Sequence, residues 1–253
     1  MKPFNFTVPD LKALYSQRYD AEMTRWRLLG ASDKAEHIEM MFKSMGKRIE
    51  TVLEVGCGTG AVLEQLAARR VGSTHTGIEI GEERSGTYNG ALEGACTNNV
   101  TVLGYDGKRI PFADASVDLV YATHVLEHVT DERSFLHELR RVARHFVYVE
   151  VPCELHLRTS YNALQESLSI GHINAYSVRS FVLTLETSGL RVLKVNVFDH
   201  SYRIRRFHCG LWNAVIKTAL RRSLLGINGY LASQLFTYHV GAICEKSVPL
   251  NLP

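Results

Sequence analysis

The chain has few cysteines, and none of them is spaced for a shared site. Five occur in 253 residues, and no two have the C-x-x-C spacing. An odd number of widely separated cysteines argues against a disulfide framework and against a thiolate zinc site. We therefore expect all five, Cys57, Cys96, Cys153, Cys209 and Cys244, to be reduced.

Long apolar runs and basic tracts are also missing. No stretch of eighteen apolar residues occurs, and residues 1–4, Met-Lys-Pro-Phe, lack the apolar core of a signal peptide. We expect a cytoplasmic protein without a transmembrane span. The net charge of +3 is small and no basic run is interleaved with aromatic residues, so we expect no nucleic-acid partner.

A strand followed by a glycine loop is the most informative feature that is present. Residues 51–55, Thr-Val-Leu-Glu-Val, have the composition of a buried strand, and Gly56, Gly58 and Gly60 follow at once. Glycine lets the backbone turn tightly and approach a ligand that any Cβ would block. Residues 61–69 have helical spacing, so the free N–H groups of that helix would face the ligand. The pattern predicts a cofactor cradle.

The glycine loop alone leaves the cofactor open. Gly56-x-Gly58-x-x-Ala61 also satisfies the loose dinucleotide pattern, which a nicotinamide-dependent oxidoreductase would show. The downstream acids narrow the choice. Glu79 stands in a predicted strand, 76–80, from which a carboxylate can accept both hydroxyl hydrogens of a ribose. Asp106 follows another strand, 100–105, and could accept a hydrogen bond from an adenine amino group, which is outside the dinucleotide pattern.

Residues 51–129 resemble the class I S-adenosylmethionine-dependent methyltransferase family. The matching motifs, in order, are E-V-G-C-G-T-G from position 54, G-I-E-I from 77, D-G from 106, P-F-x-D-x-S-x-D-x-V from 111 and V-L-E-H-V from 125. The resemblance implies S-adenosylmethionine as cofactor, S-adenosylhomocysteine as product and a small-molecule acceptor. A non-catalytic cofactor-binding scaffold and the oxidoreductase are the alternatives.

The resemblance also assigns residues to parts of the cofactor. It places Glu54 and the glycines at the methionine end, Glu79 at the ribose and Asp106 at the adenine edge. The cofactor-binding set is Glu54, Gly56, Cys57, Gly58, Gly60, Glu79, Ile80, Asp106, Gly107 and Thr123.

The order of elements predicts an α/β fold, a Rossmann-like doubly wound sheet. Strands and helices alternate up to a fifth strand, 145–151, which Pro152 would break. Ser177 would cap a helix that runs through Leu185, and further strands are expected at 191–198 and 236–244. The family implies seven strands, mostly parallel, with an antiparallel seventh strand between the fifth and the sixth. We expect residues 1–253 to form a single methyltransferase domain.

Three segments extend beyond a minimal domain. Residues 1–45 are expected to form a helical cap across the cofactor mouth, with helices beginning at Asp10 and Ser32. Residues 152–176 and 201–234 are expected on the acceptor side, because long connections are often functional. Within 201–234, one helical face is apolar and another basic: Leu211, Trp212, Val215, Ile216, Ala219 and Leu220 against Arg205, Arg206, Lys217, Arg221 and Arg222. A packed helix, a homodimer contact, an acyl-substrate wall and a peripheral membrane contact remain open.

Methyl transfer to a hydroxyl needs a general base, and histidine titrates near neutrality. His172 is the first candidate and His124 the second, both following predicted strands. Other residues expected on the acceptor side are Tyr15, Tyr19, His128, Glu154 and Asn174, the last available to orient the His172 ring. Many members of the family that methylate amino groups carry an N/D-P-P-Y/F motif after the fourth strand, and this chain lacks it. The absence favours small-molecule O- or N-methylation over methylation of nucleic-acid bases or glutamine.

One motif points to a different chemistry. Residues 124–128, His-Val-Leu-Glu-His, match the zinc-peptidase pattern H-x-x-E-H. We interpret the match as accidental, because it follows a strand, lies outside any long helix, and has no third ligand in an evident position. No metal is expected.

Overall fold

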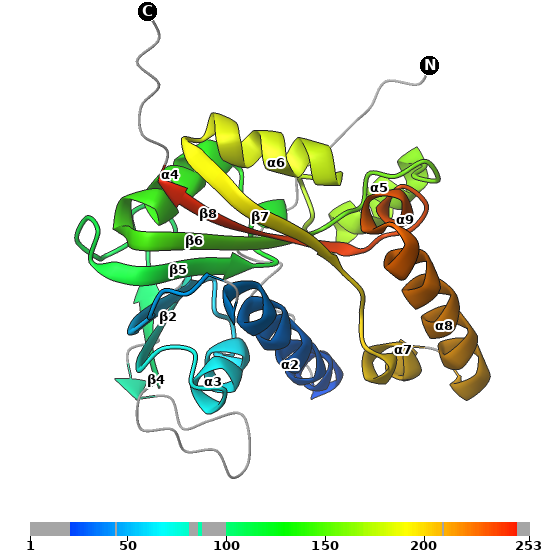
Figure 1. Ribbon diagram of the computed structural model, residues 1–253, viewed down its shortest axis with the longest axis horizontal. Helices are drawn as coiled ribbons and strands as arrows, with labels where there is room; N and C mark the ends of the chain where they lie inside the picture. The colour runs from blue at the N-terminus through cyan, green and yellow to red at the C-terminus, as the bar shows by residue number, and fades with distance from the viewer. Residues whose placement is uncertain (1–20, 44, 81–85, 88–99, 209, 247–253) are drawn as a thin grey trace, which may run out of the picture.

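The computed structural model describes residues 21–43, 45–80, 86–87, 100–208 and 210–246. These residues form one eight-stranded sheet in the order β3-β4-β2-β1-β5-β6-β8-β7 (Figure 1). Apolar and β-branched residues dominate its centre, and every residue of β5 (Val117–Thr123) is buried. Strands with such continuous burial are typical of a sheet covered on both faces.

The parallel part of the sheet brings the expected site residues to one edge. β1 (Thr51–Val55) pairs in parallel with β2 (Thr74–Ile80) and with β5, while β2 pairs with β4 (Val100–Tyr105) and β5 with β6 (Ala143–Pro152). All five strands therefore end at the same edge. In doubly wound sheets, ligands bind outside these carboxyl ends.

The last strand runs in the opposite direction. β8 (His239–Lys246) pairs antiparallel with both β6 and β7 (Leu190–Phe198), so the predicted insertion of an antiparallel strand is confirmed. Its first residue, His239, stands opposite Pro152 and therefore at the carboxyl edge of the parallel strands. The sequence did not predict β3 (Gly86–Thr87), which adds an eighth strand antiparallel to β4.

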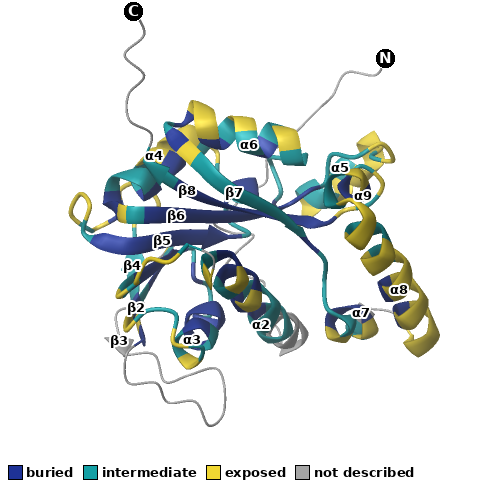
Figure 2. Cartoon of the chain, viewed as in Figure 1, coloured by how far each residue is buried: buried dark blue, intermediate teal, exposed yellow. Residues whose placement is uncertain are grey.

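Helices cover both faces of the sheet (Figures 1 and 2). On one face, the core contains residues of α4 (Glu132–Val142) and α6 (Val178–Thr187). On the other face it contains residues of α2 (Ala21–Lys43) and α3 (Ala61–Ala68). Since Ala35, Ile38 and Met41 of α2 are fully buried, this part of the N-terminal segment packs in the core. The role of 1–45 as a cap stays a prediction, and residues 1–20 lie outside the described ranges.

Several predicted boundaries are wrong. Helix α2 runs without a break through Ser32, which therefore starts no helix. Strand β6 continues to Pro152, which is tolerated because proline at the end of a strand gives up only one ladder hydrogen bond. Ser177 caps α6 as expected, accepting from Ser180 N, but the helix extends to Thr187. Strand β8 begins at His239, three residues later than predicted.

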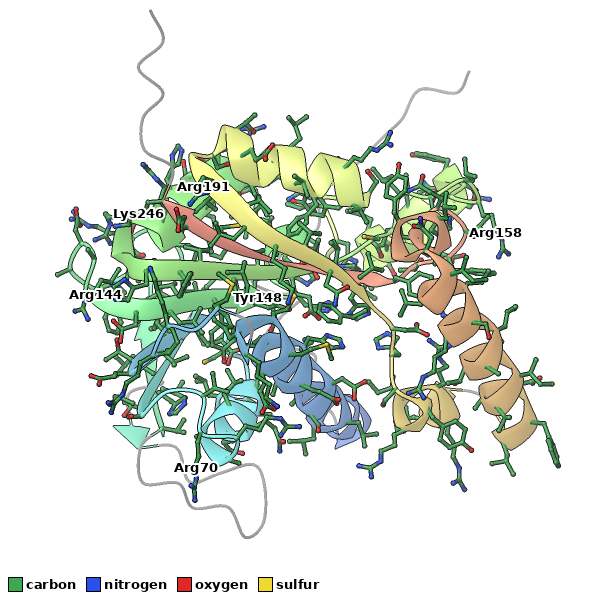
Figure 3. All side chains as sticks on the ribbon, in the orientation of Figure 1. Arg70, Arg144, Tyr148, Arg158, Arg191 and Lys246 are labelled. Atoms are coloured by element: carbon green, nitrogen blue, oxygen red, sulfur yellow. The ribbon has the colours of Figure 1, made fainter. Side chains whose placement is uncertain are left out.

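Beyond the carboxyl edge lie α5 (Tyr161–Ser169), α7 (Tyr202–His208), α8 (Leu211–Ile227) and α9 (Gly229–Ser233) (Figure 1). The opposite end of the sheet carries Arg144, Arg191 and Lys246, whereas Tyr148 lies near its middle (Figure 3). Among the described residues, no helix combines the length and hydrophobicity that a membrane crossing requires.

Helix α8 leaves its apolar face in solvent (Figure 2). Ala214 and Thr218 are its buried residues. The large side chains of the predicted apolar face, which we call the α8 apolar face, have exposed fractions from 44% to 77%: Leu211, Trp212, Val215, Ile216 and Leu220. Ala219, the sixth predicted member, is also exposed. A packed helix is therefore wrong for this face.

The predicted basic face of 201–234 is only partly correct. Arg205 and Arg221 both pair with the carboxylate of Asp199, and the Arg221 guanidinium stacks 4.0 Å from the ring centre of Tyr238. These two arginines tie α7 and α8 to the sheet. The cations that remain exposed are Arg206, Lys217 and Arg222.

Candidate functional site

The glycine loop after β1 needs backbone conformations that other residues adopt at a cost. Gly56, Gly58 and Gly60 have φ angles of +78°, +53° and +74°. A Cβ on Gly56 would lie 2.6 Å from Val125 Cγ2, so this glycine also lets the segment after β5 approach the loop. The Cys57 side chain is buried, and Gly77 makes room for its Sγ. Only the backbone of Cys57 is thus available to a ligand.

Glu54 is a buried carboxylate at the base of this loop. Its side chain is 2% exposed, and its Oε2 has no hydrogen-bond partner among the described residues. Burial raises the pKa of Glu54 to about 8. A buried acceptor without a partner costs free energy unless a ligand supplies a donor. The ammonium group at the methionine end of S-adenosylmethionine is such a donor, so Glu54 fits that cofactor.

Glu79 is oriented by the loop itself. The Gly58 amide donates to Glu79 Oε2 at 2.6 Å, and the Ile80 amide donates to Oε1 at 3.2 Å. The carboxylate therefore lies between the glycine loop and the end of β2. From this position it could accept ribose hydroxyls, a role that stays a prediction.

The adenine-side residues lie beside one another at the ends of β2 and β4. Ile80 is 50% exposed, and a Cβ on Gly107, whose φ is +76°, would come 3.2 Å from Ile80 Cδ1. Asp106 is exposed and accepts from the amides of Lys108 and Arg109, which lower the pKa of its carboxyl group. An exposed apolar side chain beside a fixed carboxylate suits a flat base with an amino edge.

The segment after β5 changes direction at His124. Thr123 is buried at the end of the strand, and His124 adopts a φ of +57°, which is uncommon for a residue other than glycine. A 3₁₀ turn, η1 (Leu126–His128), follows. Strained backbone of this kind clusters at functional sites, and here it turns the His124 side chain toward β6 and β8.

His172 has a carboxylate partner. Its Nδ1 lies 2.9 Å from Glu154 Oε1, which also accepts from the Ser167 hydroxyl at 2.8 Å. Burial alone would lower the pKa of His172, but Glu154 and the nearby Glu127 raise it above its ordinary value. A histidine held by a carboxylate through one nitrogen can use the other nitrogen as a base.

Asn174 has another role than the predicted one. Its Nδ2 donates to the carbonyl oxygens of Leu126 and Val129, at 3.0 and 2.7 Å. It therefore holds η1 in place, and Glu154 is the residue that orients His172. His128 Nδ1 lies 2.8 Å from the Gly171 carbonyl oxygen, which joins the same two segments.

Glu127 lies at the centre of the H-x-x-E-H match. It is fully buried, and its carboxylate faces His124, whose Nδ1 is 3.3 Å away. Burial alone would raise the pKa of Glu127, but His124, His128 and His172 lower it to about 2. The sequence showed no evident position for a third group near this motif, and the structure supplies one, because His172 offers a ligand atom within 4.8 Å of Glu127 and His128.

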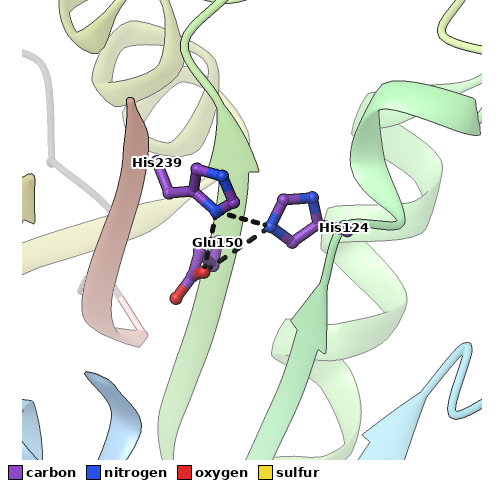
Figure 4. Close-up of side chains that lie close together, drawn as sticks. All are labelled: His124, Glu150 and His239. Carbon is purple, nitrogen blue, oxygen red and sulfur yellow. Dashed lines mark hydrogen bonds and ion pairs between the residues drawn. The ribbon is translucent and has the colours of Figure 1, made fainter. Parts of the chain in front are cut away.

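A second cluster escaped the sequence analysis. Glu150 is fully buried in β6 and faces His124 and His239 (Figure 4). Burial alone would raise the pKa of Glu150, but His37, His124 and His239 hold it well below its ordinary value. Burial lowers the pKa of His239 to about 4. These residues come from four distant parts of the chain, so no sequence spacing could reveal them.

The remaining site predictions differ in outcome. The structure brings the ten cofactor-side residues to the carboxyl edge of β1, β2, β4 and β5. His124, His128, Glu154, His172 and Asn174 form a neighbouring group after β5 and β6. Tyr15 and Tyr19 lie outside the described residues.

Comparisons with known proteins find similarity to methyltransferases. Residues 53–148 match a family model described as a methyltransferase domain. The O-methyltransferase resE of Aspergillus sclerotiorum is 34% identical over 115 residues, which cover 42% of each chain. The chloroplastic tocopherol O-methyltransferase of Arabidopsis thaliana is 27% identical over 206 residues, 77% of this chain and 55% of the relative. The chain spans about half the length of these curated relatives.

A solved structure extends the likeness over nearly the whole chain. Geranyl diphosphate methyltransferase, in complex with S-adenosylmethionine, superposes with a TM-score of 0.60 at 16% identity, covering 94% of this chain and 95% of the other. At this identity the likeness shows the fold, which is the doubly wound sheet predicted from the sequence.

Proposed function

We propose, on the premise that residues 53–148 are a class I S-adenosylmethionine-dependent methyltransferase domain, that the protein transfers a methyl group to an oxygen or nitrogen atom of a small-molecule acceptor. One observation carries the proposal. The glycine loop, the Glu79 carboxylate that it holds, and Asp106 stand at the ends of three neighbouring parallel strands.

Different residues would bind different groups of the cofactor. Glu54 would accept from the ammonium group, Glu79 from the ribose hydroxyls and Asp106 from the adenine amino group. Ile80 offers an exposed apolar surface for the base. S-Adenosylmethionine supplies a sulfonium methyl group that is already activated. The protein therefore has to align the acceptor, exclude water and, for a hydroxyl acceptor, remove a proton.

His172 is the residue that we propose as the general base. Its Nδ1 is held by Glu154, and its side chain is 14% exposed, so it is shielded but reachable. His124, the second candidate, already faces Glu127 through Nδ1 and His239 through Nε2. A ring occupied at both nitrogens is less suited to accept a proton from an acceptor, which favours His172.

The acceptor side lies at residues 152–176 and 201–234. Both segments follow strands at the carboxyl edge, and α5, α8 and α9 lie beyond that edge (Figure 1). Two curated relatives are named as O-methyltransferases, one of them acting on tocopherols, an apolar class of acceptor. We infer an acceptor with a nucleophilic hydroxyl or amine on a partly apolar body.

The α8 apolar face supports a further part of the proposal, a peripheral contact with an anionic lipid surface. Trp212 is 77% exposed and Ile216 is 64% exposed, and the exposed cations Lys217 and Arg222 lie on the same helix. Apolar side chains beside cations suit an interface with anionic lipid headgroups. A homodimer through this face is the other outcome to be tested.

We further propose a cytoplasmic location. Cys57, Cys153 and Cys244, the cysteines within the described residues, are buried and form no disulfide bond, which suits a reducing compartment. Fractionation of the source cells with an antibody against the chain tests this location.

The decisive experiment for methyl transfer uses S-adenosylmethionine with a labelled methyl group and an extract of small metabolites. The wild-type chain should move label into an extractable compound, whereas Glu79→Ala should move little at the same cofactor concentration. A thermal-shift comparison with NAD and NADP runs beside it, since a ligand selective for the native state raises its stability. Stabilisation by NAD or NADP and not by S-adenosylhomocysteine would favour the oxidoreductase instead.

A further inference from the structure

We propose that His124, Glu150 and His239 bind a divalent transition-metal ion, with Zn²⁺ the best match. The three side chains converge at the carboxyl edge of β5 and β6 and at the start of β8 (Figure 4). The proposal goes beyond methyl transfer and does not depend on it.

The distances fit three ligands of one ion. His124 Nε2 lies 2.9 Å from His239 Nδ1 and 3.6 Å from Glu150 Oε1, and His239 Nδ1 lies 3.5 Å from the same oxygen. Ligand atoms at about 2.0–2.1 Å from a tetrahedral Zn²⁺ are roughly 3.3 Å apart. The observed triangle spans this value, so an ion at its centre needs movements of only a few tenths of an ångström.

Groups behind Glu150 already fix its orientation. Its second oxygen, Oε2, accepts from the Tyr148 hydroxyl at 2.5 Å and lies 3.2 Å from His37 Nδ1. His37 in turn stacks on Phe198 at 3.8 Å between ring centres. His37 Nδ1 also lies 3.4 Å from Oε1, the oxygen that faces His124 and His239. Partners that hold the outer atoms of a ligand are typical of metal sites.

Each of the two histidines also has a partner at its outer nitrogen, a carboxylate for His124 and an imidazole for His239. His124 Nδ1 lies 3.3 Å from Glu127 Oε1, and His239 Nε2 lies 3.1 Å from His200 Nε2. A carboxylate behind a ligating imidazole is a common arrangement that fixes the ring and its tautomer. Both inner nitrogens, His124 Nε2 and His239 Nδ1, are thereby directed at Glu150 Oε1.

The donor set selects the class of ion. Two imidazoles and one carboxylate occur in zinc sites that keep a fourth position open, and in non-haem iron sites. Hard ions such as Mg²⁺ and Ca²⁺ prefer sets made of oxygen atoms. We therefore expect Zn²⁺ or Co²⁺ to bind in preference to Mg²⁺.

A hydrogen-bonded network without a metal is the competing account. In it, one of the two facing nitrogens carries a hydrogen and donates to the other across 2.9 Å. A second candidate group, Glu127, His128 and His172, lies close by and could also hold an ion. The experiment has to separate both accounts from the proposed site.

The test is a titration of the full chain, without a polyhistidine tag and treated with a chelator, with Co²⁺. Cobalt in a site of low coordination number gives a strong visible absorption, and Zn²⁺ should displace it. We expect one saturable site per chain, followed by absorption and calorimetry. His124→Ala should weaken binding by roughly 100-fold or more, because even the loss of an outer partner costs 10- to 100-fold.

Matched variants make the result unambiguous. His137→Ala, at an exposed position on α4, should bind as the wild type does. Circular dichroism checks the fold of each variant, and His124 is suitable because its side chain is 17% exposed rather than fully buried. The proposal is overturned if the wild type binds no ion saturably, or if His124→Ala binds normally. Loss of binding in His128→Ala with retention in His124→Ala also overturns it, since the ion would then belong to the neighbouring group.

Discussion

The carboxyl edge of the sheet has two halves that differ in how they are built. In the glycine half, at the ends of β1, β2 and β4, a glycine loop and the acids Glu79 and Asp106 form the proposed cofactor site. In the histidine half, at the ends of β5 and β6 and the start of β8, imidazoles surround the buried carboxylates Glu127 and Glu150. The first half offers acceptors to a ligand, whereas in the second half each buried carboxylate faces histidines of the chain itself.

This difference separates binding from chemistry. Buried carboxylates among histidines form a coupled network in which one substitution changes the charge of several neighbours. The strand-end acids, in contrast, are tied to backbone amides and act one by one. We therefore expect substitutions in the histidine half to change turnover and pH dependence, and substitutions in the glycine half to change cofactor affinity.

The largest expected effect comes from His172→Ala. If His172 removes a proton from a hydroxyl acceptor, turnover should fall by about 10²–10⁴, because general bases contribute on that scale. Cofactor affinity should be preserved, since the proposed cofactor contacts lie in the other half of the edge. Initial rates with a saturating acceptor, together with calorimetry for S-adenosylhomocysteine, measure the two quantities separately.

The matched variant is His124→Ala, assayed in the same way. A loss confined to His172→Ala assigns the base. Near-normal turnover in both variants would mean that the acceptor is already nucleophilic. It would also contradict the assignment of turnover to the histidine half.

Glu54→Gln should change how stability depends on pH. The folded pKa is about 8, above the ordinary value of 4.5, so the folded state binds more protons than the unfolded state between these values. The wild type should therefore lose stability as the pH rises from about 4.5 through about 8, by at most about 1.4 kcal/mol per pH unit. Denaturant unfolding of Glu54→Gln across this range should show a flatter profile, and an unchanged slope would contradict the account.

Glu154→Gln should shift the pH profile of turnover without abolishing it. The Glu154 carboxylate favours protonated His172 and so contributes to its raised pKa. Removing the charge should lower the pKa of His172, so that turnover begins to rise at a lower pH than in the wild type. A shift in the opposite direction, or none, would show that His172 is not the group whose titration limits the rate.

The sequence predicted one half of the edge far better than the other. The glycine loop, Glu79 and Asp106 stand at fixed distances after strands, because each belongs to a turn that a single strand delivers. Glu150 and His239 meet only because antiparallel β8 pairs with β6, and His37 arrives from a helix on one face of the sheet. Such contacts depend on tertiary packing, which local spacing does not encode.

The dependence on tertiary packing also explains the errors in the predicted helices. Ser32 has the composition of a cap, yet α2 continues through it because Ala31, Ala35 and Ile38 are buried on one side. The apolar stripe on α8 was recognised correctly, but whether a stripe is covered depends on what packs against it. In the described residues it stays exposed.

Substitutions on the α8 apolar face should have the smallest effect on cofactor affinity. Replacing Trp212 and Ile216 by serine should weaken sedimentation with vesicles that contain anionic lipid, while leaving affinity for S-adenosylhomocysteine unchanged. Asn213→Ser, an exposed polar position on the same helix, is the matched control. Unaltered vesicle binding, or a dimer seen by light scattering that the double variant abolishes, would overturn the proposed lipid contact.

Calorimetric titration with S-adenosylhomocysteine tests the central claim, cofactor binding at the glycine half, most directly. The wild type should bind at one site, and Glu79→Ala should weaken binding by about 1–3 kcal/mol, the scale of hydrogen bonds to a charged group. Glu186→Ala, an exposed acid on α6, should bind as the wild type does. Absence of binding in the wild type, or equal affinities in all three proteins, would contradict the account.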